Sequence, residues 1–393
     1  MNTIDHFSFL DKKAIIRVDF NVPVNNGEVT DSSRIVAASP TIKKIISDGG
    51  SCILMSHLGR PKGVDPKLSM GNISKEVEHV LGSEILLSKD VVGPDAKYKS
   101  KNLKPGEILL LENLRFHKEE TEGDVAFAEE LSKLADCYIN DAFGTAHRAH
   151  ASTTIIAQFF EHKFFGKLLE KEVLSIDKVM KSGEKPVLAI LGGAKISTKL
   201  PIVENIMDFV DDIIIGGGMS FTFVKALGGI IGNSIHEDEM INTALDVLQA
   251  AKNKNVKIHL PVDVICSTKF SNDGEKKIFD IDKIPEKFEG MDAGPKSLEI
   301  FKEVILKSKT ILWNGPVGVF EFSNYSNGTK SVGNAVAIST ENGAFSLVGG
   351  GDSVAAVKKF KLQNSVSYVS TGGGAMLESL EGKKLPGISA LEN

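Results

Sequence analysis

The chain has 393 residues, more than a single hydrophobic core usually supports, so two domains are expected. Hydrophobic residues make up 42% and charged residues 25% of the sequence, which is typical of ordinary globular proteins. A net charge of −5 argues against a general affinity for nucleic acids or membrane surfaces. No apolar run approaches the roughly 18 residues of a membrane span, and no signal peptide is apparent, so a cytoplasmic location is expected.

The three cysteines, Cys52, Cys137 and Cys266, are widely spaced and form no C-x-x-C pair. This pattern indicates small buried side chains in a reducing compartment, and it disfavours disulfide or zinc roles.

Four apolar runs in the first half of the chain are expected to be strands, at residues 14–22, 52–59, 107–116 and 136–144. Helical patterns lie between them, for example at 41–47, 73–81 and 124–134. Strands that alternate with helices predict a parallel, doubly wound sheet with ligands at the carboxyl ends of its strands. Polar and basic residues stand at those ends: Asp19, Asn21, His57, Arg60, Arg115 and, in the loop after the fourth strand, Arg148.

The basic residues of this half, Arg34 included, are assigned to separate loops that the fold gathers at one edge of the sheet. Surface arginines are common, but Arg60 and Arg148 are placed in turns rather than on helix faces. Guanidinium groups bind carboxylate and phosphate oxygens in pairs. The set therefore predicts a site for a small ligand with several negative charges. His147 and His150 flank Arg148, but no acidic residue has a suitable spacing, so a metal site there is disfavoured.

Residues 167–183 are expected to be an inter-domain helix with a hinge at either end. Its apolar stripe is formed by Leu169, Val173, Ile176 and Met180, and Gly183 and Pro186 follow it. This divides the chain into an N-terminal domain at 1–166 and a C-terminal domain at 184–379. The tail at 380–393 is too short to fold alone, and we expect it to pack back on the N-terminal domain.

Four apolar runs in the second half stop at paired or tripled glycines, within residues 187–195, 211–221, 345–354 and 367–376. Each glycine cluster is followed by a helix-compatible segment. Glycine lets backbone N–H groups approach an anion, and the positive end of the next helix dipole favours the same charge. Neighbouring turns of this kind predict a polyphosphate site, although none matches the P-loop or the dinucleotide fingerprint.

Charged residues accompany these turns. Asp352 is expected at the N-cap of its helix, where it can cap the helix, bind Mg²⁺ beside phosphates, or do both. Lys195 and Lys199 are four residues apart and are expected on one face of the helix that the first glycines open. A cation in a first helical turn opposes the dipole, so a phosphate partner is favoured over a solvated face. In residues 313–321, Trp313 is compatible with the core, and Asn314 and Glu321 are candidates for contact with a ribose or a base.

Eight segments together resemble the phosphoglycerate kinase family from end to end: RVDFNVP (17–23), SHLGRPKG (56–63), GTAHRAHAS (144–152), LGGAKISTK (191–199), GGGMSFTF (216–223), WNGPVGVFE (313–321), GGGDS (349–353) and TGGGA (371–375). One departure is DAGP at 292–295, where family members usually have D-I-G-P.

The resemblance implies an α/β protein with two Rossmann-like domains and a glycolytic phosphotransferase with a carboxyl group as acceptor. The reaction converts 1,3-bisphosphoglycerate and ADP reversibly into 3-phosphoglycerate and ATP, with Mg²⁺ as cofactor. The implied substrate-binding residues are Asp19, Phe20, Asn21, Arg34, His57, Leu58, Gly59, Arg60, Arg115 and Arg148. The implied nucleotide-binding residues are Gly193, Ala194, Lys199, Gly217, Gly218, Gly290, Asn314, Pro316, Val319, Glu321, Gly350, Gly351, Asp352 and Ser353. Arg34, Lys195, Gly351 and Gly374 would be catalytic, and Asp352 would bind the metal.

Such a reaction needs no general base, because both possible nucleophiles are already deprotonated at neutral pH. Catalysis would rest on positioning, on neutralising charge, and on a domain closure that excludes water. A monomer with small-molecule substrates and no nucleic-acid or membrane partner is expected. Two alternatives are a dehydrogenase, which lacks its fingerprint here, and a hinged anion-binding protein, which leaves the glycine turns with Lys195 and Asp352 unexplained.

Overall fold

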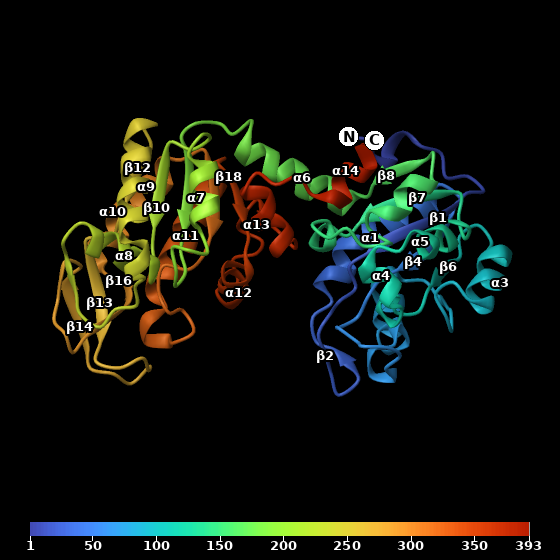
Figure 1. The fold of residues 1–393 in the computed structure, drawn as a ribbon, viewed down its shortest axis with the longest axis horizontal. Coiled ribbons are helices and arrows are strands. Elements are labelled where there is room, and N and C mark those ends of the chain that lie inside the picture. The colour runs from blue at the N-terminus through green and yellow to red at the C-terminus, as the bar shows by residue number, and fades with distance from the viewer. Residues whose placement is uncertain (393) are drawn as a thin grey trace. The chain divides into compact units, whose positions relative to one another are not determined.

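Two parallel six-stranded sheets, one in each of two units of the chain, organise the fold (Figure 1). This computed structural model describes residues 1–392. The first unit contains residues 1–174 and the C-terminal residues from Lys384 onward, and the second contains residues 175–383. The predicted α/β class, with a doubly wound parallel sheet in each half, is therefore confirmed.

The sheet of the first unit has the strand order β5-β6-β4-β1-β7-β8, and all its pairs are parallel. Its strands are β1 (Lys13–Val18), β4 (Ser51–Met55), β5 (Leu86–Leu87), β6 (Ile108–Leu110), β7 (Cys137–Asp141) and β8 (Lys163–Phe165). The four predicted strands are β1, β4, β6 and β7. Each ends earlier than expected, because the chain leaves the sheet where the polar residues begin.

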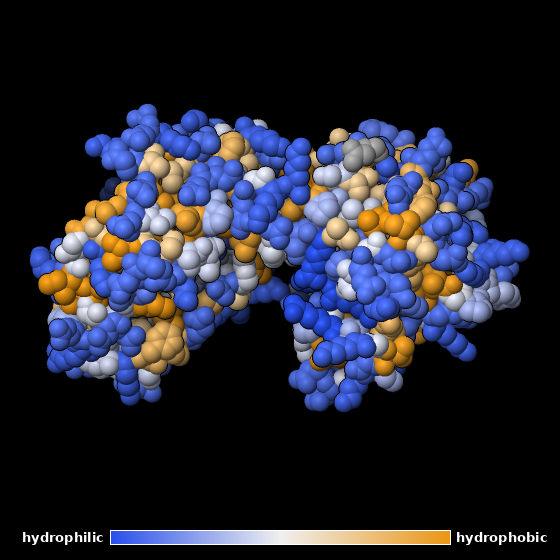
Figure 2. Space-filling view, viewed as in Figure 1, coloured by the Kyte–Doolittle hydropathy of each residue, from blue (hydrophilic) through white to orange (hydrophobic). Residues whose placement is uncertain are grey.

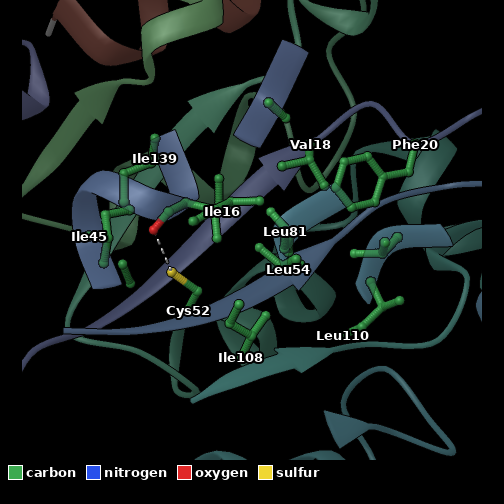
Figure 3. Packing of buried hydrophobic residues seen from close by; sticks show 14 of the residues in the cluster. Ile16, Val18, Phe20, Ile45, Cys52, Leu54, Leu81, Ile108, Leu110 and Ile139 are labelled. Atoms are coloured by element: carbon green, nitrogen blue, oxygen red, sulfur yellow. Dashed lines mark hydrogen bonds between the residues drawn. The ribbon is translucent and has the colours of Figure 1, made fainter. Parts of the chain in front are cut away.

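Alternate residues of β1 face opposite sides of this sheet. Ile16 and Val18 pack in a core with residues of α1 (Ser33–Ser47) and α2 (Ser74–Leu81), as Figure 3 shows for Ile45 and Leu81. In the same core the Cys52 thiol lies 3.9 Å from the backbone oxygen of Ile42. All three cysteines are buried, as predicted, and burial raises the pKa of each thiol.

The remaining helices of the first unit complete its layers. They are α3 (Pro94–Asn102), α4 (Lys118–Glu122), α5 (Val125–Ser132), the first part of α6 (Lys167–Met180) and the C-terminal α14 (Pro386–Glu392). The chain passes into the second unit within α6, and α14 packs against β8 and the 3₁₀ helix Ile155–Phe159.

One helix of the first unit is longer than predicted. The expected helix at 41–47 is the second half of α1, which begins at Ser33 and continues through Pro40. Proline usually ends a helical pattern because it lacks an N–H donor, which explains the late predicted start. Arg34 consequently lies in the first turn of α1, not in a loop as expected.

The sheet of the second unit has the order β12-β10-β9-β17-β18-β19, again with all pairs parallel. Its strands are β9 (Val187–Leu191), β10 (Asp212–Ile215), β12 (Lys257–His259), β17 (Thr310–Asn314), β18 (Phe345–Val348) and β19 (Tyr368–Val369). The four glycine-ended runs are β9, β10, β18 and β19, with β17 between the two pairs. All these carboxyl ends therefore lie along one edge, as predicted.

Helices cover this second sheet, and Trp313 is fully buried between the sheet and α10 and α11. The helices are α7 (Leu200–Ile206), α8 (Met219–Ala226), α9 (Ile241–Asn253), α10 (Pro295–Lys307), α11 (Asn327–Glu341), α12 (Gly351–Lys359) and α13 (Gly374–Leu380).

Short strands outside the two large sheets were not expected from the sequence. They are the antiparallel group β13 (Asp263–Ser267), β14 (Lys276–Asp280) and β16 (Glu289–Ala293), and the pairs β11 (Ile230–Ile231) with β15 (Lys283–Ile284) and β2 (Val24–Asn25) with β3 (Glu28–Val29).

Hydrophilic residues cover most of the visible face of each unit in Figure 2. Apolar residues that are nonetheless exposed include Phe270, between β13 and β14, and Ile278 on β14. Within residues 1–392, no helix combines the length and apolarity that crossing a membrane requires.

Candidate active site

In the first unit, the loops after β1 and β4 are tied together by the polar residues at their strand ends. Asn21 Oδ1 accepts a hydrogen bond from the Gly59 amide at 2.8 Å. Asp19 Oδ2 forms an ion pair with Arg34 Nη1 at 2.7 Å. The Phe20 amide donates to Ser56 Oγ at 2.8 Å. The predicted residues of these two loops are thus held against one another.

Arg115 joins this group from the end of β6. It lies in the 3₁₀ helix Leu114–Phe116, which Asn113 caps by accepting from the Arg115 amide at 3.0 Å. Asn113 also donates to the Leu58 carbonyl at 2.8 Å, and Arg115 Nη1 donates to the Gly59 carbonyl at 2.9 Å. The buried Nε of Arg115 has no hydrogen-bond partner within residues 1–392. A donor of this kind is available to a ligand.

A cavity of about 810 Å³ opens at this edge of the first sheet. Arg60, Arg115 and Arg148 of the predicted set line it, together with His150, for which no substrate role was predicted. Residues outside the predicted set also contribute, namely Lys62, His117, Lys118 and Glu119.

The electrostatics of this arginine-lined cavity favour an anion. Burial, together with Arg148 and Arg17, lowers the pKa of Arg115 to about 10. Burial and the surrounding arginines lower the pKa of His57 well below its ordinary value and that of His150 to about 4. Each shift means that a further positive charge is unfavourable here. A ligand with several negative charges would relieve this repulsion.

Arg17 lies beneath this surface and was not among the predicted site residues. It is fully buried, and its Nη2 lies 3.1 Å from His57 Nδ1. Its Nε donates to Ser152 Oγ at 2.9 Å, and that hydroxyl in turn donates to the buried carboxylate of Glu120 at 2.6 Å. The signal in the sequence was an arginine inside a strand that is otherwise apolar on both faces.

In the second unit, three loops interlock around the ends of β9, β10 and β17. The Met219 amide donates to the Gly193 carbonyl at 3.0 Å. A Cβ on Gly192 would lie 2.0 Å from the Pro316 carbonyl oxygen, so only glycine permits this approach. Gly217 has φ +67°, a conformation that glycine adopts readily.

These loops border a cavity of about 340 Å³. Nine of the predicted nucleotide-binding residues line it: Gly193, Ala194, Gly217, Gly218, Gly290, Pro316, Val319, Glu321 and Asp352. Its apolar wall includes Phe221, Val264 and Met291, and two of these come from the antiparallel strands β13 and β16. Such short strands with polar ends give little periodic signal, so this wall was not predicted.

Other predicted residues form an adjoining network at the ends of β9, β17 and β18. Lys199 Nζ donates to Asn314 Oδ1, and Asn314 Nδ2 donates to the Gly349 carbonyl at 3.0 Å. Ser353 Oγ accepts from the Gly315 amide at 2.5 Å. Burial lowers the pKa of Lys199, although the nearby Asp352 partly opposes this effect. Gly350 and Gly351 begin α12 beside this network, whereas Gly374 begins α13 after β19 and does not line the cavity.

The structure corrects the predicted positions of three charged residues. Lys195 and Lys199 are not on one helix face, because α7 begins only at Leu200, with Pro201 in its first turn. Lys195 is an exposed loop residue. Asp352 is not the N-cap of α12, because Gly350, with φ +89°, takes that position. Asp352 lies in the first turn instead, where its negative charge still interacts favourably with the helix dipole.

Two doubly wound units, each with polar residues or glycine turns at the carboxyl ends of its strands, define the class of two-unit α/β proteins, in which ligands generally bind at those strand ends. The family model described as phosphoglycerate kinase matches residues 4–383. The chain belongs to the phosphoglycerate kinase family.

Individual relatives support this assignment. The chain is 51% identical to the phosphoglycerate kinase of Porphyromonas gingivalis, over 99% of this chain and 100% of that protein. It is 48% identical to that of Thermosipho africanus, over 100% and 98%. Among solved structures, phosphoglycerate kinase from Coxiella burnetii matches with a TM-score of 0.92 and 39% identity over 99% of this chain and 98% of that chain. The enzyme from Pyrococcus horikoshii matches with a TM-score of 0.83 and 31% identity over 100% and 98%.

Proposed function

We propose that this protein catalyses reversible phosphoryl transfer from 1,3-bisphosphoglycerate to ADP, which gives 3-phosphoglycerate and ATP. The observation that carries the proposal is membership of the phosphoglycerate kinase family over residues 4–383. Relatives named for this activity cover essentially the whole chain.

We assign the glycerate to the first unit. Its arginine-lined cavity has an excess of positive charge, because the basic residues Arg60, Lys62, Arg115, Lys118 and Arg148 outnumber the single acid Glu119 in its lining. A phosphate and a carboxylate are the groups that guanidinium forks bind best.

We assign the nucleotide to the second unit. Its cavity combines an apolar wall with glycine turns, which suits a base and ribose followed by phosphates. Lys199 and the start of α12 stand beside that cavity, where they would meet the phosphates.

Asp352 fits the Mg²⁺ of a metal–nucleotide complex. It lines the cavity as a carboxylate, and no cluster of three or more metal-ligating side chains occurs within residues 1–392. Mg²⁺ commonly takes one or two carboxylates and completes its coordination with phosphate oxygens and water. When bound, the ion would neutralise part of the phosphate charge.

The protein's own groups then act by orientation and by charge. The attacking oxygen belongs to a phosphate or a carboxylate that is deprotonated at neutral pH, so no general base is needed. Lys195 and Arg34 would neutralise charge on the transferring group, and Arg34 would have to exchange its present partner, Asp19. We expect a monomeric enzyme with a cytoplasmic location.

The test is a coupled assay of ATP formation from 1,3-bisphosphoglycerate and ADP. We expect Lys195→Ala to lower kcat on the order of 100-fold with little change in ADP affinity, because its charge is used mainly in the transition state. Lys252→Ala removes the same charge from the exposed face of α9 and serves as the control. No ATP from the wild-type protein would contradict the proposed function. A parallel loss of kcat and ADP affinity would contradict the role of Lys195.

A further inference from the structure

The loop that carries Lys195 is attached to a buried carboxylate from a distant part of the chain. Glu237 lies between β11 and α9 and is only 7% exposed. Its Oε2 accepts from the Ser197 amide at 3.0 Å, and its Oε1 accepts from the Ser197 hydroxyl at 2.5 Å. One side chain thus binds the backbone two residues beyond Lys195.

Glu237 is itself held in place by the frame of the second unit. Its amide donates to the hydroxyl of Thr222 at 3.1 Å, and Thr222 is buried in α8. Nearby, Ser234 Oγ accepts from the Gly290 amide at 2.9 Å, and Ile235 lines the 340 Å³ cavity. Residues 234–237 therefore contact the cavity, the strand that carries Gly290, and the Lys195 loop.

The charge of Glu237 is stabilised chiefly by that loop. Burial raises the pKa of Glu237, but hydrogen bonds from Ser197 and from the Ile196 amide, with the charge of Lys195, lower it further than burial raises it. A buried carboxylate needs such donors, because an unsatisfied one is costly. The hydrogen bonds to Glu237 come from Ser197 and the Ile196 amide, not from the Lys195 ammonium, so the attachment fixes the backbone of the loop and leaves that ammonium able to bind a ligand.

We propose that Glu237 is a positioning residue for phosphoryl transfer, which holds residues 196 and 197 so that the Lys195 ammonium stands beside the nucleotide phosphates. The inference rests on the proposed function. Without the carboxylate, an exposed loop that begins with two glycines would sample many conformations. Small displacements of a catalytic charge slow the reaction strongly, since misplacement by about 1 Å can lower the rate on the order of 100-fold.

The experiment compares Glu237→Ala with Glu237→Gln. We expect Glu237→Ala to lower kcat by about 10- to 100-fold and to leave the KM for ADP within about threefold, because the base and ribose contacts remain. Glutamine can still accept from the Ser197 amide and donate to its hydroxyl, so we expect it to restore most of the lost rate. Glu239→Ala removes a neighbouring exposed charge and is the matched control, with an expected change below about twofold.

A double-mutant cycle distinguishes positioning from general support of the fold. If Glu237 acts through Lys195, Glu237→Ala should lower kcat less than about twofold further in a Lys195→Ala background. Equal losses in the two backgrounds would overturn the proposal. Amide hydrogen exchange provides a readout independent of activity, because Ser197 should lose protection in Glu237→Ala, and unchanged protection would also overturn it. If Glu237→Ala does not fold, the same measurements apply to Ser197→Ala, which removes the hydroxyl that donates to Glu237 Oε1. Failure of the wild-type protein to make ATP would instead contradict the proposed function, before any variant is compared.

Discussion

A single neighbour of His57 determines which of its two ring nitrogens carries a proton. The guanidinium of Arg17 lies 3.1 Å from His57 Nδ1 and can only donate hydrogen bonds. Nδ1 must therefore accept, so the ring is neutral and carries its proton on Nε2. Burial and four arginines keep the pKa of His57 low, which preserves this state. His57 would thus offer an N–H donor, not a charge, to a bound anion.

We predict that His57 stays in the neutral Nε2–H tautomer between about pH 8 and pH 6, because a lowered pKa moves protonation to more acidic conditions. Nitrogen-15 NMR of the histidine rings would measure this directly. Arg17→Gln removes one positive neighbour, so the pKa of His57 should rise in that variant. Protonation of wild-type His57 above its ordinary pKa of 6.5, or a proton on Nδ1, would contradict the assignment.

At this same scale, basic residues near strand ends were easier to find from the sequence than charged residues whose partners are distant in the chain. Arg60, Arg115 and Arg148 were found because each follows a strand, and strand position can be read from apolar periodicity. Arg17 and Glu120 were missed because their charges are balanced through Ser152, a contact that spans 135 residues from Arg17 and 32 from Glu120. Glu237 was not identified as a site residue for the same reason, since its partner Ser197 is 40 residues away in the sequence.

Among the elements, the buried glycine-ended strands were predictable, whereas the starts of α1 and α7 were not. Apolar runs bounded by glycine mark the buried strands β9, β10 and β18 directly. The start of α7 depends on Pro201 and on the contact by which Glu237 holds the preceding loop. This contact is tertiary, so local sequence does not reveal it. The edge strand β14 is mostly exposed and lacks an apolar face, so it resembles a loop in the sequence.

Asp141, a buried acid at the end of β7, accepts hydrogen bonds from the N-terminus of α6 and has a predicted effect on stability. Asp141 Oδ1 accepts from the Leu168 and Leu169 amides at 2.8 and 3.2 Å, and burial raises the pKa of Asp141 to about 7. A folded-state pKa above the unfolded value means that ionisation disfavours the folded state. Ionisation of Asp141 therefore lowers the free energy of unfolding as the pH rises from about 4 to about 7, and this loss stays constant at higher pH.

We therefore predict that Asp141→Asn gains stability relative to wild type across this pH range, by at most about 4 kcal/mol at pH 8. Asparagine can still accept from the two helix amides but has no charge to bury. Urea unfolding at pH 4, 6 and 8 would measure the difference in the free energy of unfolding between the two proteins. Glu84→Gln neutralises an exposed acid of the first unit and serves as the control. A difference that shrinks as the pH rises would show that the ionised form is the favoured one.

For the molecule as a whole, each of the two cavities is built within one unit. The arginine-lined cavity draws all its residues from the first unit, and the glycine-rimmed cavity draws all of its residues from the second. Each unit also has its own buried core. Binding of one ligand alone should therefore depend on the residues of one unit alone.

This separation predicts opposite effects for two substitutions, measured by calorimetry with each ligand added singly. Arg60→Ala should weaken 3-phosphoglycerate binding about 10- to 100-fold, since a hydrogen bond to a charged group contributes about 1.5–3 kcal/mol, and should leave ADP binding unchanged. Gly290→Ala should weaken ADP binding and leave 3-phosphoglycerate binding unchanged. A Cβ at this position would lie 2.0 Å from the Phe221 ring, which lines the nucleotide cavity. If Arg60→Ala weakened both ligands equally, the assignment of glycerate and nucleotide to separate units would be wrong, and the arginines would have to serve the nucleotide phosphates as well.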